Sequence, residues 1–405
     1  MLVALPGIKA RSLVFTSLGH FINDGNFLMF SLLLVYYKEI SQINIADVAW
    51  MAVGYNLISG LTSIGVGYVA SRTGEEGSLI SIGITLQAIS IFMFGLPFAV
   101  PDYWFLPVLA GTFFLGFGQS FYHPLGASIL RTTYGSIKAP FVMGINGSMG
   151  SLGRALMPSV LGFFILFYGN FDGFMLIFAY TIIGSSFILF GLMDYWKYSP
   201  ARAHPARGNA KESSSERYWK FMVFISAVVF LRSAFLGGAI LYISTYLVSV
   251  LHSVIEADIF LTLTFIPPII GQPILGGLTT KRGGRFATNL TGIVSAVMFS
   301  LFLLTQIPIM MALAFTVFSF MAFSLFPVML GYIGQQVKEG QGSFSNSMAW
   351  GLGNSLGFSA GAGIMTVWHY TYSIYSGMWL MLALGTVSSV LFFFIKPDLA
   401  KPNAA

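Results

Sequence analysis

Twelve apolar segments, each long enough to cross a lipid bilayer, constrain the fold of this chain more than any other feature. A bilayer core of about 30 Å needs roughly 20 apolar residues per helix. The sequence predicts such helices at residues 12–37, 47–70, 78–98, 104–130, 139–168, 173–194, 219–250, 256–279, 286–306, 308–333, 342–368 and 372–395. Only 8% of residues are charged, against about 25% in soluble domains. The predicted fold class is therefore an all-α polytopic membrane protein with 12 transmembrane helices.

The basic residues predict how this chain is oriented. If the N-terminus is cytoplasmic, 17 of the 20 Lys and Arg residues fall in cytoplasmic segments, and Lys38 alone falls outside. Because this bias sets orientation, we expect a multi-pass protein of the cell (plasma) membrane with both termini cytoplasmic. The formal charge of +6 follows the topology, so we expect the lipid bilayer, and no nucleic acid, as a partner. A monomer is expected.

The two halves of the sequence are related. The polar stretch "DYWKYSPARAHPARGNAKESSSERYWK" separates six spans from six, which predicts an N-terminal bundle at 1–194, a cytoplasmic linker at 195–218 and a C-terminal bundle at 219–405. "GYVASRTG" is repeated as "GLTTKRGG", with Arg72 and Arg282, and Gly74 and Gly284, separated by the same offset. Two parallel six-helix repeats are typical of transporters with a site at the bilayer midplane.

Three ionisable residues are predicted near the bilayer midplane. Asp24, in "GHFINDGN", follows Arg11 by 13 residues, about 20 Å along a helix, and Arg154 and Arg232 reach a similar depth by the same arithmetic. Such groups are costly in lipid and usually face a cavity or a partner. His20 shares a helical face with Asp24. We expect Asp24, with His20 nearby, to couple transport to protons and Arg154 to compete for it; alternatively, Asp24 and Arg154 form a fixed clamp.

The excess of arginine over acid indicates a type of solute. One Asp against two midplane Arg leaves a surplus positive charge, which an anionic substrate would neutralise. The alternative is that Arg232 bonds a backbone carbonyl or reaches the cytoplasmic interface.

Polar residues within other spans are candidates to line the cavity. A lone histidine such as His123 is more often a hydrogen-bonded packing residue than a proton carrier, and the sequence shows no second His or acid spaced for a metal. Gln272 stands among three prolines, so a kinked helix is expected there. The predicted substrate-binding set is Arg154, Arg232, Asn146, Asn346, Trp350, Asn354, Gln119, His123 and Gln272.

The 6+6 arrangement and its loop motif resemble the major facilitator superfamily. That resemblance implies two pseudo-symmetric six-helix bundles and gating loops at Arg72, Gly74, Arg282, Gly284 and Arg285. The chain departs from the pattern, with Ser71 and Lys281 where the loops usually carry Asp. "GHFINDGN" and "GFGQSFYHPLGASILR" also resemble the fosmidomycin-resistance branch, although Leu125 stands where an acid is expected.

Together these features predict a secondary active transporter, not an enzyme. We expect alternating access driven by the proton gradient with no cofactor, and the branch resemblance implies export, by antiport, of a small anionic or drug-like compound. Proton-coupled uptake of an organic acid or sugar is the alternative. A passive uniporter and a non-transporting receptor with the same fold are further readings.

Overall fold

The computed structural model describes residues 7–135, 137–199, 216–337 and 342–394. The secondary structure of these residues is helical, and nine of their helical stretches are long and apolar enough to cross a membrane. The predicted fold class, a 12-helix membrane protein in two bundles, is confirmed.

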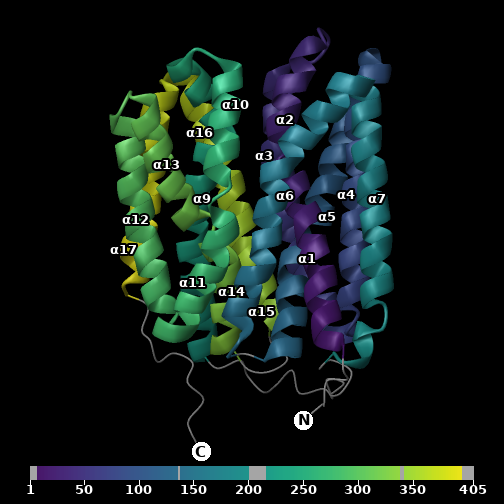
Figure 1. The fold of residues 1–405 in the computed structure, drawn as a ribbon, viewed down its shortest axis with the longest axis vertical. Helices are drawn as coiled ribbons and strands as arrows, with labels where there is room; N and C mark the ends of the chain where they lie inside the picture. Colours follow the sequence, from purple (N-terminus) through teal and green to yellow (C-terminus); the bar gives the residue numbers. More distant parts are fainter. Residues whose placement is uncertain (1–6, 136, 200–215, 338–341, 395–405) are drawn as a thin grey trace, which may run out of the picture.

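The first six spans come from the N-terminal half of the chain and lie together on the right of Figure 1. They are α1 (Ile8–Phe27) with α2 (Met29–Tyr36), α3 (Ile45–Thr73), α4 (Glu76–Ala99), α5 (Phe105–Tyr134), α6 (Ala139–Tyr168) and α7 (Asn170–Leu192), with short 3-10 turns at Tyr37–Glu39, Pro101–Tyr103 and Tyr195–Lys197.

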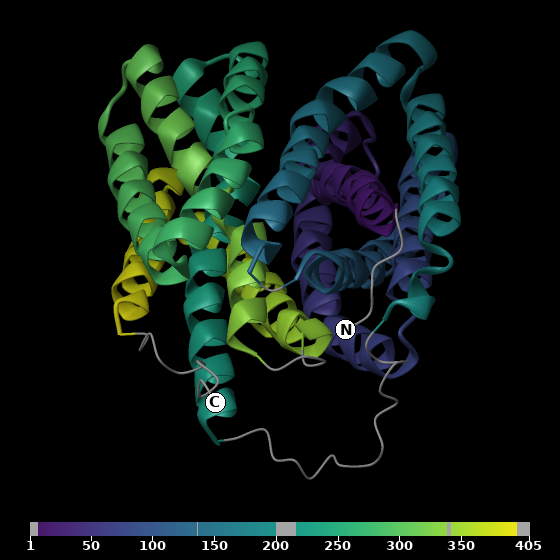
Figure 2. The ribbon, with the colours of Figure 1, turned by 60° about the horizontal axis from the view of Figure 1, so that its bottom comes forward.

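The second six spans form a matching group. They are α9 (Glu216–Leu251), α10 (Val254–Phe265) with α11 (Pro268–Arg282), α12 (Gly284–Leu304), α13 (Pro308–Ala322) with α14 (Leu325–Gln336), α15 (Gly342–Met348) with a π-helical segment (Ala349–Ser355) and α16 (Leu356–Thr371), and α17 (Ile374–Phe392). Figure 2 shows the two groups as separate bundles.

Several spans predicted as continuous are interrupted. The eighth is broken at Pro267–Pro268, as its prolines led us to expect, because proline lacks the N–H that a helix interior needs. The first is interrupted at Leu28, the tenth between Ala322 and Leu325, and the eleventh by the π-helical segment. The predicted domain bounds remain predictions, and residues 200–215 of the predicted linker lie outside the described residues.

The two ends of the molecule need names. We call the end at which α1 begins and α17 ends the terminal end, at the bottom of Figure 1, and the opposite end the distal end. In the terminal half, one apolar cluster contains residues of both bundles, among them Leu130 and Met143 with Met222 and Ile333. Arg131, at the end of α5, donates to the carbonyl of Val337 at 3.0 Å. The bundles are therefore joined in the terminal half.

A line of small residues on the eleventh span lies against α3 and forms what we call the seam. Ser63 donates to the carbonyl of Ser347 (3.2 Å), Ser59 contacts Ser355 (3.4 Å), and Ser359 donates to the carbonyl of Val53 (2.9 Å). Between them the backbones are so close that a Cβ at Gly351 would meet the carbonyl of Gly60 at 2.5 Å. Small residues allow helices in lipid to approach in this way.

Candidate functional site

Four ionisable side chains gather in the interior of the N-terminal bundle. The Asp24 carboxylate is 2% exposed, and its Oδ2 forms an ion pair with Arg154, whose Nη1 lies 2.8 Å away. His20 Nε2 lies 3.3 Å from the same oxygen, and His123 Nε2 lies 3.1 Å from Oδ1. We call these four residues the Asp24 cluster. They come from α1, α5 and α6, so three helices converge on one carboxylate.

Gly150 makes this convergence possible. It faces the cluster from α6, and a Cβ there would collide with the His20 ring and lie 2.8 Å from Asp24 Oδ2. Asn146, Gly150 and Arg154 lie one turn apart on the same face of α6, so the predicted Asn146 and Arg154 do face the polar centre. The glycine admits the histidine, and the two polar members bond to the cluster on either side of it.

Asn146 orients the His20 ring through one of its nitrogens. Its Nδ2 donates to Thr16 Oγ1 (3.2 Å) and Ser17 Oγ (3.3 Å), so its Oδ1 faces His20 Nδ1 at 2.8 Å. An amide oxygen only accepts, so Nδ1 carries a hydrogen. The other ring nitrogen, Nε2, lies 3.3 Å from Asp24 Oδ2, and neither atom has a hydrogen-bond partner among the described residues.

Three side-chain amides form a hydrogen-bond network around the Asp24 carboxylate. Asn23 Nδ2 donates to Asp24 Oδ1 at 3.1 Å, and Gln87 on α4 donates to Asn23 Oδ1 at 2.7 Å. The predicted Gln119 donates to the Asn23 carbonyl at 2.8 Å. Gln119 therefore positions α1, and its side chain reaches the carboxylate only through Asn23. Networks of this kind fix a buried charge in one orientation.

The C-terminal bundle reaches the Asp24 cluster through three residues. The indole of Trp350 stacks on the His123 ring, with centroids 3.8 Å apart. Gln272 donates to Ser151 Oγ at 2.6 Å, and Arg154 donates to the same oxygen at 3.1 Å. The Arg154 guanidinium also lies over the Phe323 ring, 5.9 Å from its centroid. Trp350, Gln272 and Arg154 are thus brought together across the bundle interface.

Three predicted residues lie away from the cluster. Arg232 donates to the carbonyl of Ala322 inside the C-terminal bundle, which is the alternative considered from the sequence. Asn354 accepts from Ser233 at 2.9 Å, because Gly357 lets α9 approach the eleventh span closely enough for the amide to bond there. Asn346 is fully buried, and its amide has no hydrogen-bond partner among the described residues.

The two predicted gating loops differ in geometry. Gly74 ends α3 in the left-handed conformation (φ 71°), whereas in the second copy the positive φ belongs to Gly283 (86°) and Gly284 begins α12. Gly284 instead allows close packing, since a Cβ there would collide with Tyr332. Arg72 and Arg282 lie over Tyr68 and Phe286 on their own sides of the molecule, each 5.3 Å from the ring centroid.

Arg285, the last of the predicted gating residues, bonds within its own bundle. It donates to the carbonyl of Phe393, which follows the final helix. Its contact therefore ties α12 to the end of α17.

The cluster also corrects the expectation that no His or acid is placed to bind a metal. Ligand atoms of His20, Asp24 and His123 lie within 4.8 Å of one another. The sequence could not show this, because His123 comes from another helix. However, the guanidinium of Arg154 lies 2.8 Å from Asp24, and its fixed positive charge opposes a cation at the same carboxylate. We therefore describe the group as a cluster of charged and titratable side chains.

Sequence reasoning missed Asn23, Gln87, Ser151 and Tyr122. Tyr122 donates its hydroxyl to the Thr16 carbonyl at 2.7 Å and packs on His20, with ring centroids 4.8 Å apart. Gln87 carried a usable signal, since it is an amide in the middle of an apolar span. Ser151 carried none, because serines within helices commonly bond their own backbone.

This fold, with two six-helix bundles and a buried charge cluster at their interface, defines a class of membrane transporters. Residues 16–258 match the sequence profile of the Major Facilitator Superfamily. That match spans more than half of the chain, and the chain belongs to this superfamily. A search of curated proteins found no match to the chain.

Solved structures with the same fold extend the comparison to nearly the whole chain. The human organic anion transporter MFSD10 (TETRAN) is 15% identical, with a TM-score of 0.68 over 95% of this chain and 98% of the other. FucP, a Major Facilitator Superfamily transporter solved in the outward conformation, is 14% identical, with a TM-score of 0.69 over 97% and 99%. At these identities the similarity establishes the fold alone. The chain is thus a multi-pass membrane transporter and not an enzyme.

Proposed function

We propose that this protein is a proton-coupled secondary active transporter of the cell membrane, which moves a small drug-like solute outward by alternating access. The observation that carries the proposal is the Asp24 carboxylate, buried against one arginine and two histidines where the bundles meet. An acid inside a membrane span costs free energy to bury, and the acids found there usually take part in function.

The coupling proton would occupy the place between His20 Nε2 and Asp24 Oδ2. When it leaves, Arg154 remains as the partner of the bare carboxylate. Arg154 also shares Ser151 with Gln272 of the other bundle. Movement of one bundle would therefore change the surroundings of the guanidinium and, through it, how firmly the proton is held.

The bundle contacts support alternating access. The terminal half is closed by an apolar cluster and by the bond from Arg131 to Val337. A pocket lies on the distal side of Asp24, beside Phe27 and Tyr55. With the terminal end on the cytoplasmic side, as the distribution of Lys and Arg favours, this state would load or release its solute on the outer face.

Export is favoured by the two motifs that resemble the fosmidomycin-resistance branch. Proton-coupled uptake of an organic acid or sugar uses the same machinery with the fluxes reversed, so direction must come from measurement. A uniporter or a receptor would have no need for an exchangeable proton at Asp24.

The decisive experiment compares the wild type with Asp24→Asn in proteoliposomes. A pH gradient is imposed, and flux is measured for a panel of carboxylates, sugars and uncharged aromatic compounds. We expect the wild type to concentrate at least one solute and the variant to retain equilibrium exchange without concentrating it. Accumulation by Asp24→Asn equal to that of the wild type would refute coupling through this residue, and a wild type that moves solute without movement of protons would support a uniporter.

A further inference from the structure

Gln87, near the middle of α4, reaches the Asp24 carboxylate through one other side chain. Its Nε2 donates to Asn23 Oδ1 at 2.7 Å, and Asn23 Nδ2 donates to Asp24 Oδ1 at 3.1 Å. All three side chains are buried, with at most 2% of each exposed. Gln87 and Asn23 therefore form a short chain of hydrogen bonds that ends on the carboxylate.

The direction of this chain is fixed by a backbone carbonyl. A side-chain amide can face a neighbour with its oxygen or its nitrogen, and its partners decide which. Gln119 lies 2.8 Å from the Asn23 carbonyl, which can only accept, so Gln119 presents its Nε2 there. That Nε2 also lies 3.5 Å from Gln87 Oε1, and Asn26 Nδ2 donates to the same oxygen at 3.2 Å. Two donors thus face the Gln87 oxygen, which leaves its nitrogen for Asn23.

The orientation of Gln87 determines which side of the Asn23 amide faces the cluster. Because Gln87 donates to Asn23 Oδ1, Asn23 Nδ2 points to the other side, 3.1 Å from Asp24 Oδ1 and 3.3 Å from His123 Nε2. An N–H that faces a carboxylate stabilises its charged form. If the amide turned over, an oxygen would face Asp24 Oδ1, and that contact is attractive only with a proton between the two oxygens.

We infer that Gln87 is a positioning residue of the proposed proton site. By holding Asn23 with its N–H toward Asp24, Gln87 makes the carboxyl group release its proton more readily. This inference rests on the proposed function, in which Asp24 carries the coupling proton, and it adds a residue from a fourth helix that does not touch the carboxylate.

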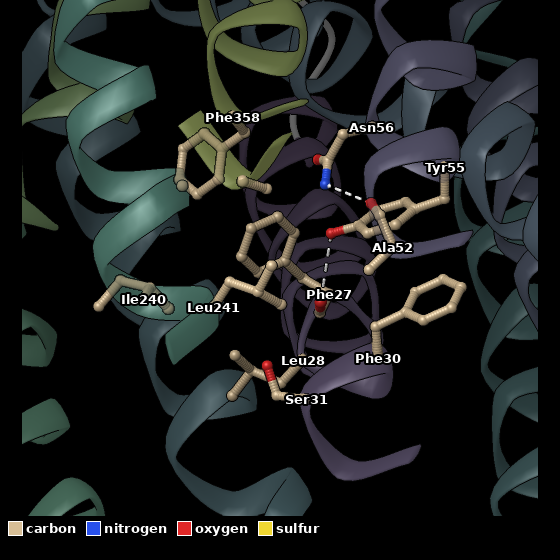
Figure 3. A pocket seen from close by; sticks show the side chains of 12 residues that line it. Phe27, Leu28, Phe30, Ser31, Ala52, Tyr55, Asn56, Ile240, Leu241 and Phe358 are labelled. Atoms are coloured by element: carbon tan, nitrogen blue, oxygen red, sulfur yellow. Dashed lines mark hydrogen bonds between the residues drawn. The ribbon is translucent and has the colours of Figure 1, made fainter. Parts of the chain in front are cut away.

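Other groups also act on the Asp24 carboxylate. The titratable side chains around it are His20 of α1, His123 and Tyr122 of α5, and Arg154 of α6. On the distal side of Asp24, none of the described residues that line the pocket carries a charge (Figure 3). Gln87 is neutral, so its substitution changes no charge near Asp24, and an effect on the proton must come through the hydrogen bonds.

Infrared spectroscopy follows the proton directly. A protonated carboxyl group has a C=O stretching band that the ionised group lacks, and the part of the band that Asp24→Asn removes belongs to Asp24. The band is recorded against pH on the purified full-length protein, with no solute and no gradient. Gln87→Met removes the polar atoms at nearly constant size. We expect Asp24 in this variant to bind its proton about two- to tenfold more tightly, the worth of one hydrogen bond.

Three further variants show whether the effect passes through Asn23. In an Asn23→Ala background, Gln87→Met should cause no further shift in the titration. Gln119→Met, which removes the donor fixed by the backbone carbonyl, should shift the titration in the same direction as Gln87→Met. Ser90→Ala is the matched control, because Ser90 is a buried residue of α4 whose hydroxyl bonds to the backbone of its own helix. It should leave the titration unchanged.

A folded Gln87→Met variant that titrates as the wild type does would overturn the inference, as would an equal shift in the Asn23→Ala background. If Gln87→Met does not fold, Gln119→Met decides, and an unshifted titration there overturns the inference. If the band shifts as expected but Asp24→Asn still accumulates solute, coupling fails and the role of Gln87 stands. A wild type without an Asp24 band at any pH at which it is folded refutes both.

Discussion

Trp350 of the C-terminal bundle stacks on His123 of the N-terminal bundle, with ring centroids 3.8 Å apart and planes inclined by 26°. The imidazole thus contacts the Asp24 carboxylate by its edge and the opposite bundle by its face. Any motion that separates the bundles at this depth must uncover that face. The stack is therefore a direct physical link between the charge cluster and the interface.

A double-mutant cycle should detect this link. His123→Ala and Trp350→Ala, alone and combined, should show a coupling energy of about 0.5–1.5 kcal/mol in unfolding measured in detergent, the usual worth of an aromatic pair. His123→Ala with Trp368→Ala is the control, because Trp368 packs on Tyr372 of its own span and should show no coupling. Additive effects for the Trp350 pair would mean that the stack contributes nothing.

Arg154→Ala should lower the free energy of unfolding more than the double variant Arg154→Ala, Asp24→Asn, which removes both charges. The Asp24 carboxylate is 2% exposed, and Arg154→Ala leaves it without its guanidinium partner. Breaking a buried ion pair in this way costs about 3–5 kcal/mol of stability. Asp24→Asn in the same chain should restore part of that stability. The measurement is the unfolding free energy of each variant, and a double variant less stable than Arg154→Ala would contradict the pairing.

The pH dependence of transport should respond to Asn146. In the wild type, His20 Nδ1 lies 2.8 Å from the amide oxygen of Asn146. Asn146→Asp replaces that oxygen with a carboxylate oxygen, so that His20 has a carboxylate on both sides. A second carboxylate adds negative charge beside the proposed proton site and attracts the coupling proton there, so the pH of half-maximal flux should rise. The control is Asn354→Asp, where the amide bonds to Ser233 in the other bundle. An equal rise in both variants would point to a general charge effect.

A methyl group in the seam should drive the bundles apart. Gly351→Ala puts a Cβ 2.5 Å from the carbonyl of Gly60 on α3. The control is Gly65→Ala, also on α3, where a Cβ meets nothing within 4 Å. Overpacking costs about 1–3 kcal/mol, which changes the ratio of two states about 5–150-fold. The chain has no cysteine, so spin labels at Thr73→Cys and Lys281→Cys report the separation of the terminal ends directly.

Only Gly351→Ala should lengthen that distance, in pulsed electron paramagnetic resonance on the labelled protein. If the Gly65 and Gly351 variants give the same distribution as the unsubstituted labelled chain, the seam does not restrain the bundles.

The fold was predictable because lipid leaves few solutions. Long apolar segments must be helices, and their breaks follow chemistry that the sequence displays, as at Pro267 and Pro268. The interruption at Leu28 also had a marker, since Gly25 and Asn26, two weak helix formers, lie just before it. The long apolar run that follows them hid the break, because it predicted one continuous span.

The candidate site was predictable in part. Depth along a helix identified Asp24 and Arg154, because a charge in an apolar span needs a partner and few were available. Depth does not fix direction: Arg232 lies at a similar level yet turns to Ala322, and helical periodicity alone does not say which neighbour a face meets. His123 lies next to Asp24 because α1 and α5 cross at an angle that brings the two side chains together. No local pattern in the sequence encodes that angle.

The seam has a mechanical consequence. Ser347, Gly351, Ser355 and Ser359 meet α3 at intervals of four residues, and the contacts are hydroxyl bonds and bare backbone. Leu356 is the large side chain that packs across this line, over Gly60, so little has to be withdrawn before the two surfaces roll over one another. Each bond is weak enough to exchange singly. In the alternating access proposed above, this line would be the axis about which the bundles tilt while the rest of their interface opens and closes.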